Sequence, residues 1–124
     1  MNQMNWKLSH WKVDAMRLDT EEKEWLDRFV DELSRRFPEA VDRVIVFGSK
    51  ARGDADSDSD LDVLVVATGD EKLKTSIRIL GYELALRENV VPSIVVYTSE
   101  EFEQRRQNRS VFIESVERDG VVVC

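Results

Sequence analysis

Residues 44–66 read VIVFGSKARGDADSDSDLDVLVV, in which two apolar runs are joined by an aspartate-rich connection. Both runs are continuous and rich in β-branched residues, which predicts strands that are covered on both faces. Gly48 ends the first run, and a glycine followed by the hydroxyl of Ser49 is typical of a turn that cradles a phosphate. Asp60 and Asp62 open the second run, where a spacing of two places both carboxylates on one face. Because paired carboxylates repel unless a cation lies between them, this stretch predicts a divalent metal site beside a phosphate site.

Two other interpretations of this stretch do not fit its spacing. A calcium loop needs glycine at its sixth position and glutamate at its twelfth, and no register of the aspartates provides both. A P-loop needs the order Gly-x-x-x-x-Gly-Lys-Ser/Thr, which is absent around Gly48-Ser49-Lys50. We interpret Asp54, Asp56 and Asp58 as a solvated acidic loop. Asp62 does not fit that interpretation, because a charge inside an apolar strand is costly without a partner.

The remaining segments predict a single α+β domain with a small mixed sheet flanked by helices. The first helix is capped by Asp19 or Thr20 and ended by Pro38, and it carries apolar residues at helical spacing. Thr98 followed by Glu101 has the form of a capping box and opens a later helix. The other expected elements are strands at 44–47, 61–66 and 93–97, a helix over about 70–88, a helix from 111, and a tail at 121–123 that pairs or packs on the sheet.

The composition predicts a soluble, cytoplasmic protein of one domain. The 124 residues carry a formal net charge of −7, which argues against a nucleic-acid partner held by phosphate contacts. The single cysteine excludes an internal disulfide, and no apolar run has the length of a membrane span or the form of a signal peptide. We divide the chain into an N-terminal arm, residues 1–18, and a domain, residues 19–124. Trp6 and Trp11 in the arm either pack onto the domain or dock a partner, and His10 receives no chemical role.

The spacing Gly48-Ser49, ten residues, Asp60-x-Asp62 resembles the motif of nucleotidyltransferases in the DNA polymerase β superfamily, and the whole stretch is similar to the minimal nucleotidyltransferases. The resemblance implies a nucleotidyltransferase fold over residues 19–124. It implies that Gly48 and Ser49 bind the triphosphate of ATP or another nucleoside triphosphate, and that Asp60 and Asp62 are catalytic carboxylates that bind Mg²⁺ or Mn²⁺. It also implies a partner protein, since many members are antitoxins paired with a HEPN-domain protein and some are inferred to transfer AMP to it.

The chain departs from this family at the third carboxylate, which a neighbouring strand normally supplies. No Asp or Glu lies between Glu88 and Glu100, and Ser93 takes the expected place. Because a serine cannot accept a proton near neutral pH and binds metal weakly, two hypotheses stay open. One is a nucleotidyltransferase that binds Mg-ATP, and the other is a degenerate module that acts as an antitoxin or partner-binding protein. Arg52 either lies near the phosphates or pairs with the acidic loop, and a homo-oligomer is also left open.

Overall fold

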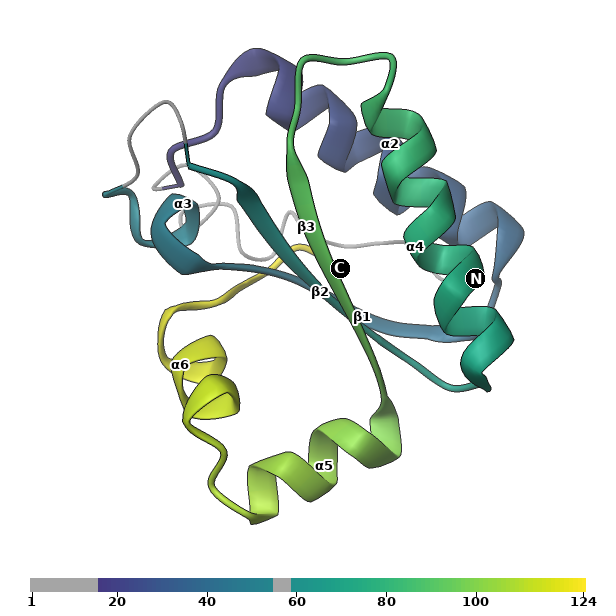
Figure 1. Ribbon diagram of the computed structural model, residues 1–124, viewed down its shortest axis with the longest axis vertical. Coiled ribbons are helices and arrows are strands. Elements are labelled where there is room, and N and C mark those ends of the chain that lie inside the picture. Colours follow the sequence, from purple (N-terminus) through teal and green to yellow (C-terminus); the bar gives the residue numbers. More distant parts are fainter. Residues whose placement is uncertain (1–15, 55–58) are drawn as a thin grey trace.

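The computed structural model describes residues 16–54 and 59–124, and this part of the chain forms a four-stranded sheet with helices on both faces (Figure 1). The strand order is β3-β2-β1-β4, in which β1 is antiparallel to β2 and β4, while β2 and β3 are parallel. The elements are α2 (Thr20–Arg36), β1 (Val41–Phe47), α3 (Gly48–Arg52), β2 (Leu61–Ala67), α4 (Glu71–Ala85), β3 (Pro92–Thr98), α5 (Ser99–Gln107), α6 (Val111–Asp119) and β4 (Val121–Val122). The expected α+β class with a small mixed sheet is confirmed.

Alternating side chains of the strands pack into two separate hydrophobic cores, one on each face of the sheet. On one face, Val63 and Val65 of β2 pack with the apolar sides of α2 and α4. On the other face, Leu64 and Val66 pack with α5 and α6 through Phe102, Ile113 and Val116. This alternation follows from the two-residue repeat of a strand, and it explains why the central strands read as continuous apolar runs.

Helix α4 packs against α2 and β3 at a glycine, Gly81. Trp25 of α2 is fully buried, and its indole Nε1 donates a hydrogen bond to the carbonyl oxygen of Gly81 at 3.0 Å. A methyl group at Gly81 would overlap the side chain of Ile94 on β3. The glycine therefore lets the helix approach the strand while the tryptophan satisfies its polar atom.

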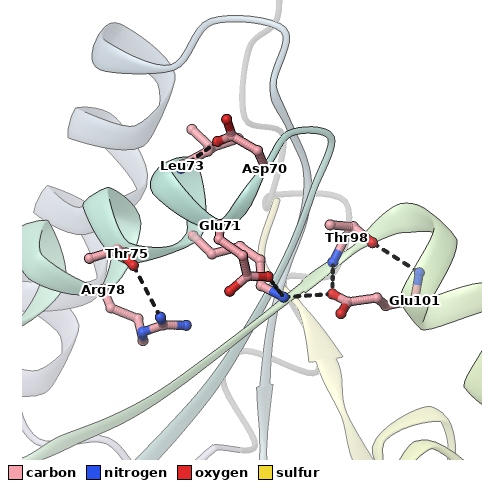
Figure 2. Close-up of polar contacts among 8 residues, drawn as sticks. Asp70, Glu71, Leu73, Thr75, Arg78, Thr98 and Glu101 are labelled. Carbon is pink, nitrogen blue, oxygen red and sulfur yellow. Dashed lines mark hydrogen bonds and ion pairs between the residues drawn. The ribbon is translucent and has the colours of Figure 1, made fainter.

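A buried lysine fastens α4 to the start of α5 (Figure 2). Lys74 Nζ lies 2.8 Å from Glu101 Oε1 and 2.9 Å from Glu71 Oε2. Glu101 Oε1 also accepts a hydrogen bond from the backbone N–H of Thr98 at 2.8 Å, which completes the predicted capping box. The junction of β3 and α5 is thus held by paired charges.

Several boundaries differ from the prediction. The residues after β1 form the short helix α3 rather than a turn alone, and β1 begins at Val41, three residues earlier than its apolar run. Helix α4 ends at Ala85, and β2 and β3 extend slightly beyond their apolar runs. In the ranges that the structure describes, no helix combines the length and apolar character that a membrane span requires.

The described chain starts at Met16, so the tryptophans and the histidine of the proposed arm lie outside it. Met16 is buried in the core, and the N–H of Arg17 donates to the carbonyl oxygen of Lys50 at 2.9 Å. Residues 16 and 17 therefore contact the domain next to α3.

Candidate functional site

The turn from β1 into α3 brings the backbone of Gly48 against Asp62. Gly48 has a φ of 77°, a left-handed conformation that favours glycine. Phe47, the residue before it, is the register partner of Asp62 in the antiparallel pair of β1 and β2. A methyl group at Gly48 would overlap Asp62 Oδ2. The two halves of the sequence motif therefore meet at one point, although an aspartate-rich connection separates them along the chain.

Three residues form a row across the sheet at this point. Asp62 is the register partner of Phe47 on β1 and of Ser93 on β3. Directly paired residues of neighbouring strands point to the same face, so the Ser93 side chain lies on the face of Asp62. Ile94, the next residue, is 5% exposed and belongs to the opposite core. The register sets Ser93 beside Asp62, and the idea that Ser93 replaces a third carboxylate stays a prediction.

The charge on Asp62 is unfavourable in this protein. Burial raises the pKa of the Asp62 carboxyl, the neighbouring charge of Asp60 raises it further, and Arg52 lowers it. Asp60 lies immediately before β2, so its carboxylate acts on Asp62 from the same end of the strand. A divalent cation would replace this repulsion with attraction, and carboxylate oxygens are the donors that Mg²⁺ and Mn²⁺ favour. Asp60 and Asp62 could therefore hold such an ion together with substrate phosphates.

A third strong ligand is missing from this part of the chain. Within residues 16–54 and 59–124, no three His, Cys, Asp or Glu side chains are grouped so as to hold a metal. Ser93 offers only a hydroxyl beside Asp62. The donor set thus fits a metal that shares its coordination with a bound phosphate, and it does not fit a closed protein cage.

Arg52 stands at the end of α3, between the acidic loop and Asp62. Its Nε lies 3.2 Å from Asp54 Oδ2, and both side chains are exposed. The same guanidinium lowers the pKa of Asp62. The structure therefore shows the ion pair with the acidic loop, which is one of the two expected roles of Arg52.

Aromatic side chains line the same face of the sheet next to Asp62. The Phe112 ring of α6 contacts the rings of Phe47 and Tyr97 edge-on, with centroid distances of 5.2 Å and 6.1 Å. Since Phe47 and Tyr97 lie on β1 and β3, the Phe112 ring spans the central strand β2. The Arg105 guanidinium lies 4.7 Å from the centre of the Tyr97 ring. Helix α6 thereby contributes an apolar wall to the side of the site.

The sequence analysis missed the partner of Lys50. Lys50 Nζ lies 2.7 Å from Glu22 Oε2, and both residues are 5% exposed. A signal was present, because Glu22 stands four residues before Leu26 and seven before Phe29, on the apolar side of α2. A charged residue at such a position predicts a buried partner. Asp56 and Asp58 of the acidic loop lie outside the described residues.

This arrangement, a glycine-serine turn seated on an aspartate of the adjacent strand, is that of a nucleotidyltransferase domain. The family model described as nucleotidyltransferase domain matches residues 26–121 of this chain. The match spans more than half of the sequence, so the chain belongs to this family.

Among proteins of known description, the chain is similar to the "Putative protein adenylyltransferase MJ0141" of Methanocaldococcus jannaschii. The two are 32% identical over 102 residues, which cover 81% of this chain and 96% of that protein. A solved structure described as a toxin-antitoxin with AMP-PNP has a TM-score of 0.52 and 21% identity, and the match covers 78% of this chain and 71% of that one. At that identity the solved structure supports the fold alone.

Proposed function

We propose that this domain binds a nucleoside triphosphate, ATP first, as a complex with Mg²⁺ or Mn²⁺ and transfers its nucleoside monophosphate to an acceptor. The acceptor would attack the α-phosphorus, and the bond to the β-phosphate would break and release pyrophosphate. Gly48 and Ser49 would hold the phosphates, Asp60 and Asp62 would hold the metal, and Arg52 would turn from Asp54 to the phosphates. The observation that carries this proposal is the contact of Gly48 with Asp62, which places a phosphate-binding turn directly beside the acidic pair.

The chemistry of such a transfer is mainly positioning and charge neutralisation. A metal held by Asp60 and Asp62 would neutralise charge that develops on the phosphates during in-line displacement. The backbone N–H groups near Gly48 and the Ser49 hydroxyl would orient the triphosphate. The acceptor hydroxyl would approach along β3, where Ser93 stands beside Asp62 and offers no general base.

We propose a protein as the acceptor, and an antitoxin role toward it. The name of the Methanocaldococcus jannaschii relative refers to adenylylation of protein, and the similar solved structure is described as a toxin-antitoxin. A HEPN-domain protein is the partner that the motif resemblance implies. The formal net charge of −7 also disfavours a nucleic-acid acceptor. We place this activity in the cytoplasm, where ATP is available.

A second function is favoured by one observation, the serine opposite Asp62. Without a third carboxylate, the domain would bind nucleotide or a partner protein without turnover. In that case the acidic pair serves recognition of a metal-nucleotide complex, and the partner is controlled by binding alone.

Transfer of a labelled α-phosphoryl group from ATP to a co-expressed partner separates the two functions. Metal-dependent labelling by the wild type that Asp60→Ala abolishes would refute the non-catalytic function. Labelling that appears only in Ser93→Asp would show that chemistry is lost for want of a carboxylate. Ile94→Asp is the matched control, because it places the same charge on the opposite, buried face and should only destabilise the domain. Tight partner binding without labelling in the wild type and in Ser93→Asp would refute the enzymatic function.

A further inference from the structure

A buried ion pair lies behind the Gly48-Ser49 turn and takes no part in the site described above. Lys50 Nζ lies 2.7 Å from Glu22 Oε2 and 2.9 Å from Glu22 Oε1. The pair joins α3 to the first turn of α2 across 28 residues of sequence. Both segments lie toward the same end of the molecule in Figure 1. Both residues are 5% exposed, so water screens the pair very little.

A buried ion pair is weak evidence for a stabilising role of the lysine at this position. Removing two charges from water costs free energy that their attraction repays only in good geometry. Well-packed apolar residues of similar volume often leave a protein equally stable or make it more stable. The capping box with Asp19 explains a Glu or Gln at position 22, but it requires nothing of position 50.

Helix α3 depends on contacts from outside for its position. It has only five residues, whereas isolated helices shorter than about 12 residues are marginal in water. Its N-cap residue, Phe47, makes no side-chain capping bond. Ala51 packs into the core, and the carbonyl oxygen of Lys50 accepts from Arg17. The Lys50 side chain adds an attachment one residue from Ser49 and two from Gly48.

The other half of the pair is itself fixed. Glu22 Oε1 accepts a hydrogen bond from the N–H of Asp19 at 3.0 Å, and Asp19 Oδ1 accepts from the N–H of Glu22 at 2.8 Å. Trp25 and Phe29 anchor the following turns of α2, and both are fully buried. A continuous set of contacts therefore runs from the core through Glu22 and Lys50 to the turn.

The turn has little tolerance for movement. Gly48 lies so close to Asp62 that a methyl group does not fit between them. A shift of α3 would change the distance from the backbone of Gly48 and Ser49 to the acidic pair, and binding sites need their groups held to within about 0.5 Å.

We infer that Lys50 and Glu22 are positioning residues, whose ion pair holds the Gly48-Ser49 turn against Asp62 and sets the affinity for a metal-nucleotide complex. The effect of this ion pair on nucleotide affinity rests on the proposed function. The restraint on α3 does not, and it is measurable in the free protein.

The test uses the double variant Glu22→Gln/Lys50→Met. Gln preserves the capping box and Met preserves the length of the lysine stem, so no unpaired charge stays buried. The matched control, Glu103→Gln/Arg106→Met, makes the same chemical change at a pair on α5 whose side chains are 44% and 51% exposed. For each protein we would measure urea unfolding, amide hydrogen exchange without nucleotide, and Mg-ATP binding by calorimetry.

We expect the double variant to keep the stability of the wild type while amides of α3 exchange faster than in the control. Mg-ATP affinity should fall by roughly tenfold, the lower end of what loss of an orienting partner costs at metal sites. Unchanged exchange in α3 would overturn the inference. So would failure of the double variant to fold, because the pair would then serve stability. If the wild type does not bind Mg-ATP, the proposed function fails, while the exchange of α3 still decides whether the pair restrains the turn.

Discussion

The two ends of the sheet differ in whether they favour the charged forms of their ionisable side chains. At the end of β3, the hydrogen bond between Lys74 and Glu101 raises the pKa of the lysine and lowers the pKa of the glutamate, so both charged forms are favoured (Figure 2). At the start of β2, burial and the charge of Asp60 raise the pKa of Asp62, so its charged form is disfavoured.

The contrast separates charges that have a partner within the fold from charges that would gain one in the proposed metal-nucleotide complex. Lys74 is 8% exposed and has two carboxylate partners, as a charge at that depth requires. Asp62 is partly buried beside another acid, an arrangement that weakens the free protein. Such unfavourable ionisation is concentrated at functional sites, where a bound cation supplies the missing partner. The difference supports the proposal that the start of β2 binds a ligand, whereas the end of β3 serves the fold.

The largest expected effect is the loss of ligand binding in Asp62→Asn. The change removes the charge at nearly constant shape, so Mg-ATP should no longer raise the melting temperature, whereas a hundredfold excess over Kd stabilises a binding-competent fold by about 2.7 kcal/mol. The free variant should be as stable as the wild type or more stable, because the repulsion from Asp60 is relieved. Asp31→Asn, on the exposed side of α2, is the control and should bind normally. Marked destabilisation of free Asp62→Asn would instead identify Asp62 as a structural partner.

Substitution of Gly48 tests whether the turn and the acidic pair are in contact. Gly48→Ala should destabilise the free protein by about 2 kcal/mol, because alanine disfavours the left-handed φ and its methyl overlaps Asp62 Oδ2. In an Asp62→Ala background the overlap is absent, so the same change should cost about 1 kcal/mol less in a double-mutant cycle. Urea unfolding of the four proteins gives this coupling. Additive effects would place Asp62 away from the turn.

Sequence analysis predicted the elements that have a clear apolar run or repeat. The apolar runs predicted β1, β2 and β3. The family resemblance put Ser93 at the expected place of a third carboxylate, and the strand register sets Ser93 beside Asp62. The sequence pattern did not predict helix α3, because its five residues include one apolar side chain, Ala51, and a helical repeat needs more.

The long-range contacts that support the site could not be predicted from local sequence patterns. The pairing of Lys50 with Glu22 depends on the tertiary arrangement of α3 and α2, and no short-range spacing encodes a contact across 28 residues. The same limit applies to Phe112, whose position over β2 follows from the way α6 packs on the sheet.

A smaller effect is expected where the charges are paired. Glu101→Ala removes the main partner of Lys74 and half of a capping box. Because the Glu101 side chain is 38% exposed and Glu71 still pairs with the lysine, the loss should be only about 1 kcal/mol. Mg-ATP binding should not change. A fall in affinity without loss of stability would contradict the division of roles between the two ends.

The smallest effect is a difference in the sign of the pH dependence. The pKa of Asp62 is raised in the folded protein, so its penalty is absent below the pKa of the unfolded state and grows as pH rises through the folded value. The pKa of Glu101 is lowered, so its contribution is present above the unfolded value and is lost as pH falls through the folded one. In urea unfolding from about pH 3 to about pH 7, the free energy of unfolding of Asp62→Asn should therefore rise relative to that of the wild type as pH rises. The free energy of unfolding of Glu101→Gln, which keeps the capping box, should fall relative to that of the wild type over the same range. Curves that stay parallel to the wild type for both variants would mean that neither end of the sheet couples proton binding to folding.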